Sequence, residues 1–231
     1  MENEYFTLNL PSRGECYPSK KGTVEIRQMT VSDEDMFTVD VVDDSFSAVD
    51  LLIDRCLKTL DLSASNMCAA DREFVMLWLR INAYGSEYEY IDSKSGETKT
   101  FDLSTIKYIE TSEKGDENGY FTINYGKDCV KVKFLTHYED DEMYIRMKLA
   151  YGNSRGDEKA VLKAMLMPCI VSINDETSDN YKEEWFDSKD VEEIKDFSVM
   201  LYKIMPRIDG EGQIVLDLSD SILINAVIKK N

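Results

Sequence analysis

Residues 6–37 read FTLNLPSRGECYPSKKGTVEIRQMTVSDEDMF, and residues 121–144 read FTINYGKDCVKVKFLTHYEDDEMY. The words FTLN and VEIRQMT of the first stretch return in the second as FTIN and VKVKFLT, and each stretch then reaches an acidic cluster. Around Phe6 the residues alternate, with Phe6, Leu8 and Leu10 on one face, which is the period of a half-buried strand. Each stretch therefore predicts a β-hairpin, and only the first hairpin carries a long, decorated turn.

Two further words recur later in the chain and in the same order. FVMLWLRI (74–81) matches SVMLYKIM (198–205), and FDLSTIKYI (101–109) matches LDLSDSILI (216–224). We therefore predict two tandem copies of one small module, at residues 1–114 and 115–231. The polar, glycine-containing segment TSEKGDENG (111–119) would link them. The alternative is that short words of high β-propensity recur by chance.

The rest of each module has helical and hairpin patterns. Thr30 or Ser32 can cap a helix whose first turn is acidic, as the helix dipole favours. Apolar residues at helical spacing predict further helices, and a turn around Gly96 predicts a second hairpin. The predicted ranges are helices at 45–60, 69–85, 157–167 and 188–205, a hairpin at 87–104, and a closing strand with a short helix or strand at 212–228. The predicted fold class is α+β, with antiparallel strands and two or three helices in each module.

Length, apolar content and net charge limit the kinds of protein that this chain can be. A chain of 231 residues with 43% apolar residues can bury a core without disulfides. Its 27 basic and 45 acidic residues give a net charge of −18, which disfavours nucleic acid as a partner. The acidic surface fits a solvated coat or a basic partner surface.

The cysteines and the N-terminus indicate the compartment. Five cysteines occur without a Cys-x-x-Cys pair, which fits buried free thiols in a reducing cytoplasm. The start MENEYFTLNL has no basic segment followed by an apolar one, so we expect no secretory signal. No apolar run approaches the ~20 residues of a membrane helix, so we expect no membrane partner.

Few motifs in this sequence indicate catalysis or the binding of a cofactor or metal. His137 is the one histidine, and we expect it at the surface or at a helix cap rather than in a catalytic triad. Glycine-rich phosphate loops and closely spaced zinc ligands are missing, and the many carboxylates single out no acid and base. We therefore predict no catalytic residue, no cofactor and no metal ligand, with an enzyme as the minority alternative.

Three parts of the chain carry a family resemblance. They are LPSRGECYP (10–18) with the VEIRQMTVSDEDMF that follows, DREFVMLWLRINAYGSEYEY (71–90) and FDLS (101–104). In this order they resemble the baseplate hub assembly family of T-even-type contractile-tailed bacteriophages. The resemblance covers most of residues 5–109 and, through the repeat, more weakly the rest. Some relatives carry cysteine pairs where this chain has YIDSKSGETKTF, so a zinc knuckle is not carried over.

The resemblance implies a role in assembling the central hub of the tail baseplate. The partners would be other phage tail and baseplate hub proteins, and the place would be the host cytoplasm during assembly and the virion tail baseplate if the protein stays. Two alternatives are a transient chaperone absent from the virion and an enzymatic or small-molecule-binding α+β domain. The oligomeric state is left open.

The decorated turn at residues 11–22 is the predicted contact with a partner. Prolines restrict its backbone, Gly14 permits a bend, and Tyr17 offers a rigid amphipathic anchor. The hairpin that begins at Phe121 has only Tyr125 to Asp128 at the corresponding place. The alternative is that the loop packs on its own sheet. The predicted contact residues are Pro11, Ser12, Arg13, Gly14, Tyr17 and Pro18.

Overall fold

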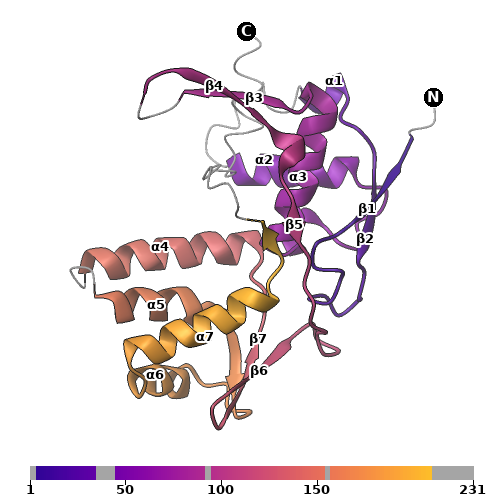
Figure 1. Ribbon diagram of the computed structural model, residues 1–231. Coiled ribbons are helices and arrows are strands. Elements are labelled where there is room, and N and C mark those ends of the chain that lie inside the picture. Colours follow the sequence, from indigo (N-terminus) through magenta and orange to yellow (C-terminus); the bar gives the residue numbers. More distant parts are fainter. Residues whose placement is uncertain (1–3, 35–44, 92–94, 154–156, 210–231) are drawn as a thin grey trace. The chain divides into compact units, whose positions relative to one another are not determined.

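The computed structural model describes residues 4–34, 45–91, 95–153 and 157–209, and it confirms the α+β class (Figure 1). The chain forms two compact units. Of the described residues, the first contains 4–11, 23–34, 45–91, 95–109 and 207–209, and the second contains 12–22, 110–153 and 157–206. The decorated turn of the first hairpin thus belongs to the second unit, and the chain returns to the first unit after Pro206.

In the part that the structure describes, the first unit combines three two-stranded antiparallel sheets with helices. In chain order its elements are β1 (Phe6–Asn9), β2 (Thr23–Ile26), α1 (Val31–Glu34), α2 (Ser45–Cys56), η2 (Ala64–Asn66), α3 (Ala69–Tyr84), β3 (Glu87–Ile91), β4 (Thr98–Asp102), η3 (Leu103–Thr105), β5 (Tyr108–Ile109) and β9 (Arg207–Ile208). β1 pairs with β2, β3 with β4, and β5 with β9. The predicted second hairpin is therefore confirmed as β3–β4.

The core of the first unit lies between α2 and α3. The apolar residues predicted at helical spacing in α2 are buried, including Leu52 and Ile53. In α3, Leu77 of the predicted spacing is buried together with Val75 and Leu79, which that spacing did not single out, whereas the predicted Phe74 and Trp78 are half-buried. This apolar burial is the main source of the unit's stability. α3 ends at Gly85, whose φ of 83° suits glycine and whose N–H donates to Ile81 O at 2.8 Å.

The second unit has one three-stranded antiparallel sheet and four helices among its described residues. Its elements are β6 (Phe121–Tyr125), β7 (Asp128–Val132), α4 (His137–Asn153), α5 (Glu158–Leu166), η4 (Met167–Cys169), β8 (Ile170–Ile173), α6 (Asp179–Asp187) and α7 (Val191–Ile204). α4 packs on α5, and α5 packs on α7. α5 and α7 confirm the two predicted helices, whereas α4, α6 and β8 come in addition.

The first two repeated words form hairpins with the same register. In β1–β2, Leu8 lies opposite Val24, and in β6–β7 the corresponding Ile123 lies opposite Val130. The next pair also corresponds, because Phe6 lies opposite Ile26 as Phe121 lies opposite Val132. The third pair of words falls in α3 and α7. Of the fourth pair, residues 216–224 lie outside the described residues.

The residues after each hairpin also make matching contacts. Asp33 accepts from Arg27 Nη1 at 2.7 Å and from the Thr30 backbone N–H at 2.8 Å. Glu139 pairs with Lys133 and accepts from the Thr136 backbone N–H at 3.0 Å. In each case a carboxylate three residues after a threonine ties a helix start to the cation that ends the hairpin, which is a capping arrangement.

A cysteine carbonyl completes the match between the two halves. The backbone N–H of Arg27 donates to Cys56 O at 3.0 Å, and that of Lys133 donates to Cys169 O at 2.8 Å. The residue after each cysteine then pairs with the second hairpin strand, Leu57 with Ile26 and Ile170 with Val132. The halves thus share a hairpin, a capped helix start and the beginning of a third strand.

Candidate interaction surfaces

The decorated turn Ser12–Gly22 is a compact loop. Arg13 and Gly14 have φ values of 55° and 77°, and the Gly14 N–H donates to Ser12 Oγ at 3.1 Å. A Cβ on Gly14 would lie 2.4 Å from the Gly22 nitrogen, so only glycine fits there. Tyr17 is 6% exposed, so its ring lies inside the unit.

The loop packs against the segment predicted to be a linker. Lys20 Nζ donates to Gly115 O at 2.8 Å and to Glu15 O at 2.9 Å. A Cβ on Gly115 would lie 2.1 Å from Glu15 O, and one on Gly119 would lie 2.2 Å from Cys16 O. Backbone meets backbone at both places, so residues 111–119 are a packed part of the second unit rather than a free tether.

The predicted contact residues differ in their access to solvent. Pro11, Ser12, Gly14 and Tyr17 are buried, whereas Arg13 and Pro18 are exposed. The sequence could not show that residues 111–119 return to this loop. In this conformation Arg13 and Pro18 are the members of the set that a partner can reach, and Tyr17 holds the loop in place.

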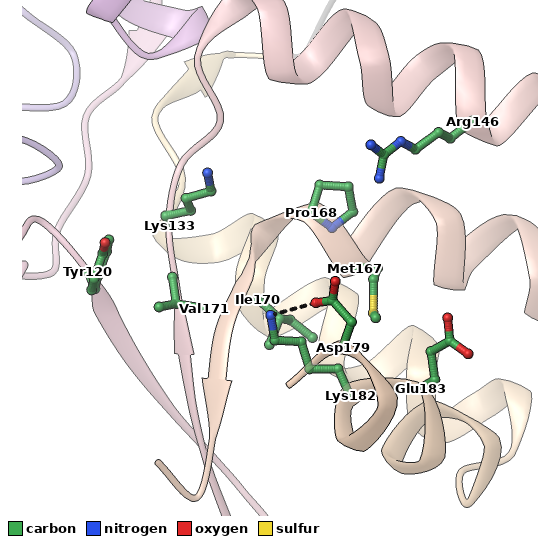
Figure 2. Close-up of a pocket in the computed structure, with 10 residues that line it drawn as sticks. All are labelled: Tyr120, Lys133, Arg146, Met167, Pro168, Ile170, Val171, Asp179, Lys182 and Glu183. Carbon is green, nitrogen blue, oxygen red and sulfur yellow. Dashed lines mark hydrogen bonds and ion pairs between the residues drawn. The ribbon is translucent and has the colours of Figure 1, made fainter. Parts of the chain in front are cut away.

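A pocket of about 460 Å³ opens in the second unit (Figure 2). No sequence pattern predicted it, because its lining comes from η4, β8, α4, α6 and the residues that flank β6 and β7. Apolar and charged side chains are mixed in this lining. The lining residues are Tyr120, Lys133, Arg146, Met167, Pro168, Ile170, Val171, Asp179, Lys182 and Glu183.

The pocket concentrates three cations in an acidic chain. Lys182, whose side chain is largely buried, has its Nζ 3.2 Å from Asp179 Oδ1, and Figure 2 shows this pair below Pro168. Arg146 lines the side formed by α4, and its Nη2 lies 3.5 Å from Glu142 Oε2. Lys133 pairs with Glu139 at the start of α4. These carboxylates partly neutralise the cations, so a bound carboxylate would compete with existing ion pairs.

The lining contains no serine, cysteine or histidine, but it does contain Asp, Glu, Lys and Tyr side chains, which can also act as acids or bases. The volume of the pocket falls within the roughly 300–1,000 Å³ of ligand pockets. A group that combines an apolar part with a charge would match this mixture of side chains.

The outer face of α4 is a second exposed surface. Tyr138, Ile145 and Leu149 are 40–59% exposed, and their spacing places them on one side of the helix. Met143 and Met147, on the opposite side, are half-buried. We call Tyr138, Ile145 and Leu149 the α4 stripe.

His137, expected at the surface or at a helix cap, is the first residue of α4 and is 9% exposed, so it lies at a helix start and not at the surface. Its Nε2 lies 3.4 Å from Asp141 Oδ2, one helical turn further on. The threonine cap before it places the side chain against the unit instead of in solvent. Asp140, also in the first turn, has its pKa raised by burial.

Burial makes the thiols of Cys56 and Cys169 unreactive. Burial raises the pKa of Cys56 to about 11 and that of Cys169 to about 12. Because the thiolate is the nucleophile, neither cysteine is suited to covalent chemistry near neutral pH. This agrees with the interpretation of these residues as core cysteines.

Of the helices in the described parts of the chain, none combines the length and apolar character needed to span a bilayer.

Comparison with protein families gives one result that covers nearly the whole chain. The model of the family described as T4 bacteriophage base plate protein matches residues 4–211. Comparison with curated proteins gives no match, and comparison with solved structures gives none either. The two hairpins, the capped helix starts and the surfaces described above therefore lie within the matched region. The chain belongs to the T4-type bacteriophage base plate protein family.

Proposed function

We propose that the protein is a non-enzymatic component or assembly factor of the baseplate hub, and that it acts by binding other tail proteins. Membership of a baseplate family implies contact with other phage tail proteins and a place in the tail baseplate. The more specific assignment to the hub of the baseplate rests on the family resemblance of residues 10–18, 71–90 and 101–104. The proposal that the protein acts by binding other tail proteins rests on the pocket of the second unit.

The pocket carries this proposal because its chemistry suits a segment of another protein. Met167, Pro168 and Val171 offer an apolar surface for one side chain. Lys133 and Lys182 beside them, which pair with Glu139 and Asp179, would exchange these partners for a carboxylate next to that side chain. The proposed occupant is therefore an extended segment of a tail protein in which an apolar residue is flanked by Asp or Glu.

The decorated turn would supply a second contact. Its exposed members, Arg13 and Pro18, project from a loop whose backbone is fixed by glycine and by packing on residues 111–119. A rigid loop loses little entropy when it binds. The buried members, Tyr17 among them, would act through the shape of the loop.

The two halves are proposed to be copies of one module. The matched hairpin registers, the matched threonine caps and the matched cysteine carbonyl support this relationship over residues 6–57 and 121–170. The decorated turn would then be an addition to the first copy alone. The decorated turn would thus be a contact found in one copy only, whereas the pocket includes Lys133 and Ile170 of the matched part.

Two rival functions make different predictions. A transient hub-assembly chaperone would act in the host cytoplasm and be missing from finished virions, so quantitative mass spectrometry of purified particles separates it from a structural component. A small-molecule-binding or enzymatic domain would use the pocket for a ligand of its own. This rival would be favoured if the purified protein bound a metabolite and Val171→Asp abolished that binding.

The test of the proposed function is complementation with pocket variants. A phage that lacks the gene is grown in cells that supply the wild-type chain or Val171→Asp, and assembled baseplates are counted by sedimentation. Val171→Asp should fold, since the residue is only half-buried, but should lower the baseplate count. The matched control is Val199→Asp on α7, which is 49% exposed and lies outside the lining. Equal counts for both variants would overturn the role of the pocket.

A further inference from the structure

The α4 stripe is flanked by charges in a definite order. Successive residues turn by about 100° around a helix axis, so side chains near the stripe can be assigned to its two sides. Glu142 and Arg146 lie on one side, and Asp141 and Lys148 lie on the other. On both sides the acidic residue precedes Ile145 and the basic residue follows it.

These flanking charges are accessible. Glu142 and Arg146 are exposed and face each other across one turn, with 3.5 Å between Oε2 and Nη2. Asp141 is partly exposed, and Lys148 lies over the Tyr144 ring with its Nζ 4.3 Å from the ring centroid. The Glu142–Arg146 pair is exposed and lies within one helix, so it contributes little and its two groups can exchange partners at small cost.

The order of the charges makes the face self-complementary. When two such helices lie antiparallel with their Ile145 residues near the centre, Glu142 of each faces Arg146 of the other. On the other side, Asp141 of each faces Lys148 of the other. A parallel arrangement would instead place acid beside acid, which is destabilising. The apolar stripe would fill the space between the two rows of charges.

We propose that the chain pairs with a second copy of itself through the α4 stripe, with the two α4 helices antiparallel. The contact is isologous, so one surface serves both copies and the assembly closes as a dimer. Removal of the stripe from water supplies the driving force, and the four charge pairs set the direction. This inference does not use the decorated turn and shares only Arg146 with the pocket, so its test at Ile145 is separate from the test of the proposed function.

A lipid surface fits this face less well than a second copy does. Anionic headgroups attract amphipathic helices that are rich in lysine and arginine. Here Asp141 and Glu142 lie beside the stripe, and the chain carries a net charge of −18. An anionic bilayer would therefore be repelled, whereas an antiparallel copy presents a base to each acid.

The test is sedimentation velocity of the full-length protein between about 1 and about 100 μM. The wild-type chain should shift from monomer to dimer with concentration, and Ile145→Asp should remain a monomer. Ile145 is exposed, so this change leaves the fold intact, as circular dichroism would show. The matched control Val199→Asp on α7 should dimerise like the wild type.

A charge exchange tests the direction of the pair. Asp141→Lys and Lys148→Asp should each weaken dimerisation by about tenfold or more, because each places like charges opposite one another. The double variant Asp141→Lys/Lys148→Asp should recover the wild-type affinity, since the pairs are restored with signs exchanged. A wild-type chain that is monomeric throughout, a dimer insensitive to Ile145→Asp, or a double variant no better than the singles would overturn the proposal.

Discussion

The carboxylate of Asp33 receives the guanidinium of Arg27 in two hydrogen bonds, with Nη1 at 2.7 Å from Oδ2 and Nη2 at 3.1 Å from Oδ1. Thr30 adds its backbone N–H and its hydroxyl, both at 2.8 Å. Burial by itself raises the pKa of Asp33, but these hydrogen bonds outweigh it and lower the pKa to about 2. The start of α1 is thus held by a carboxylate that remains charged well into acid.

This pair predicts a specific acid sensitivity. The folded-state pKa lies below the ordinary value of 3.8, so the carboxylate stabilises the fold above about pH 4 and loses that effect as the pH falls toward 2. The shift corresponds to about 2 kcal/mol. In urea titrations, the unfolding free energy of the wild type should fall between pH 6 and pH 2. That of Asp33→Asn should fall by about 2 kcal/mol less over the same range. Glu89→Gln, on an exposed strand position, is the control and should follow the wild-type curve.

Glycine substitutions test the packing of the decorated turn. Gly119 and Gly126 both have positive φ, but only at Gly119 would a Cβ strike backbone, 2.2 Å from Cys16 O. Gly126→Ala should lower the unfolding free energy by about 1 kcal/mol from backbone strain alone. Gly119→Ala should lower it by clearly more, because the loop must move away. Equal losses in both variants, measured by thermal unfolding, would show that the loop is not held against residues 111–119.

Thiol labelling tests the burial of the cysteines. Cys56, Cys68 and Cys169 are buried, and Cys16 and Cys129 are intermediate. At pH 8 a thiol reagent should therefore label about two of the five thiols quickly in the native protein and all five in guanidinium. Peptide mapping should place the fast label on Cys16 and Cys129. Fast labelling of Cys56 or Cys169 in the native state would contradict the cores described for both halves.

A buried carboxylate in the second unit gives a fluorescence test. Asp128 accepts from Trp185 Nε1 at 2.9 Å and from Asn174 Nδ2 at 3.0 Å, and Lys189 Nζ lies 3.5 Å away. Asp128→Ala should cost about 2–3 kcal/mol, because it leaves buried donors without an acceptor. Asp128→Asn retains an acceptor oxygen and should cost less. The order of the two midpoints, followed by the emission of Trp185 in a Trp78→Phe background, checks this, and a reversed order would contradict it.

Sequence periodicity recovered the elements that have one buried face. The words around Phe6 and Phe121 gave both hairpins, and the apolar spacing around Leu52 and Leu77 gave α2 and α3. Their patterns are strong because each element buries one side against a core. The α+β class followed from these elements alone.

Elements without such a pattern were not predicted. α4 carries Met143 and Met147 on its inner side and Ile145 and Leu149 on its outer side, so its apolar residues surround the helix axis. β8 is a short apolar run that follows Pro168, and such a run is also compatible with the end of a helix. Hydrophobic periodicity identifies neither element, because it detects an element only when one face is apolar and the opposite face is polar.

The surfaces depend on contacts between distant parts of the chain. The pocket joins Tyr120 to Glu183 through several elements, and no local motif reports such a meeting. Tyr17 looked like an exposed anchor because the sequence does not show that residues 111–119 pack on its loop. Loop composition predicted that the turn is special, but its buried and exposed members could be told apart only in the fold.

The most direct test of recognition at the pocket is photo-crosslinking during infection. A photoreactive phenylalanine analogue at position 171 would report on the occupant, with the same analogue at position 199 as control. The proposed function predicts a crosslink from position 171 to a tail protein of the phage, at a peptide whose apolar residue is flanked by Asp or Glu. Crosslinks from position 171 that match those from position 199, or that lead to no tail protein, would contradict it.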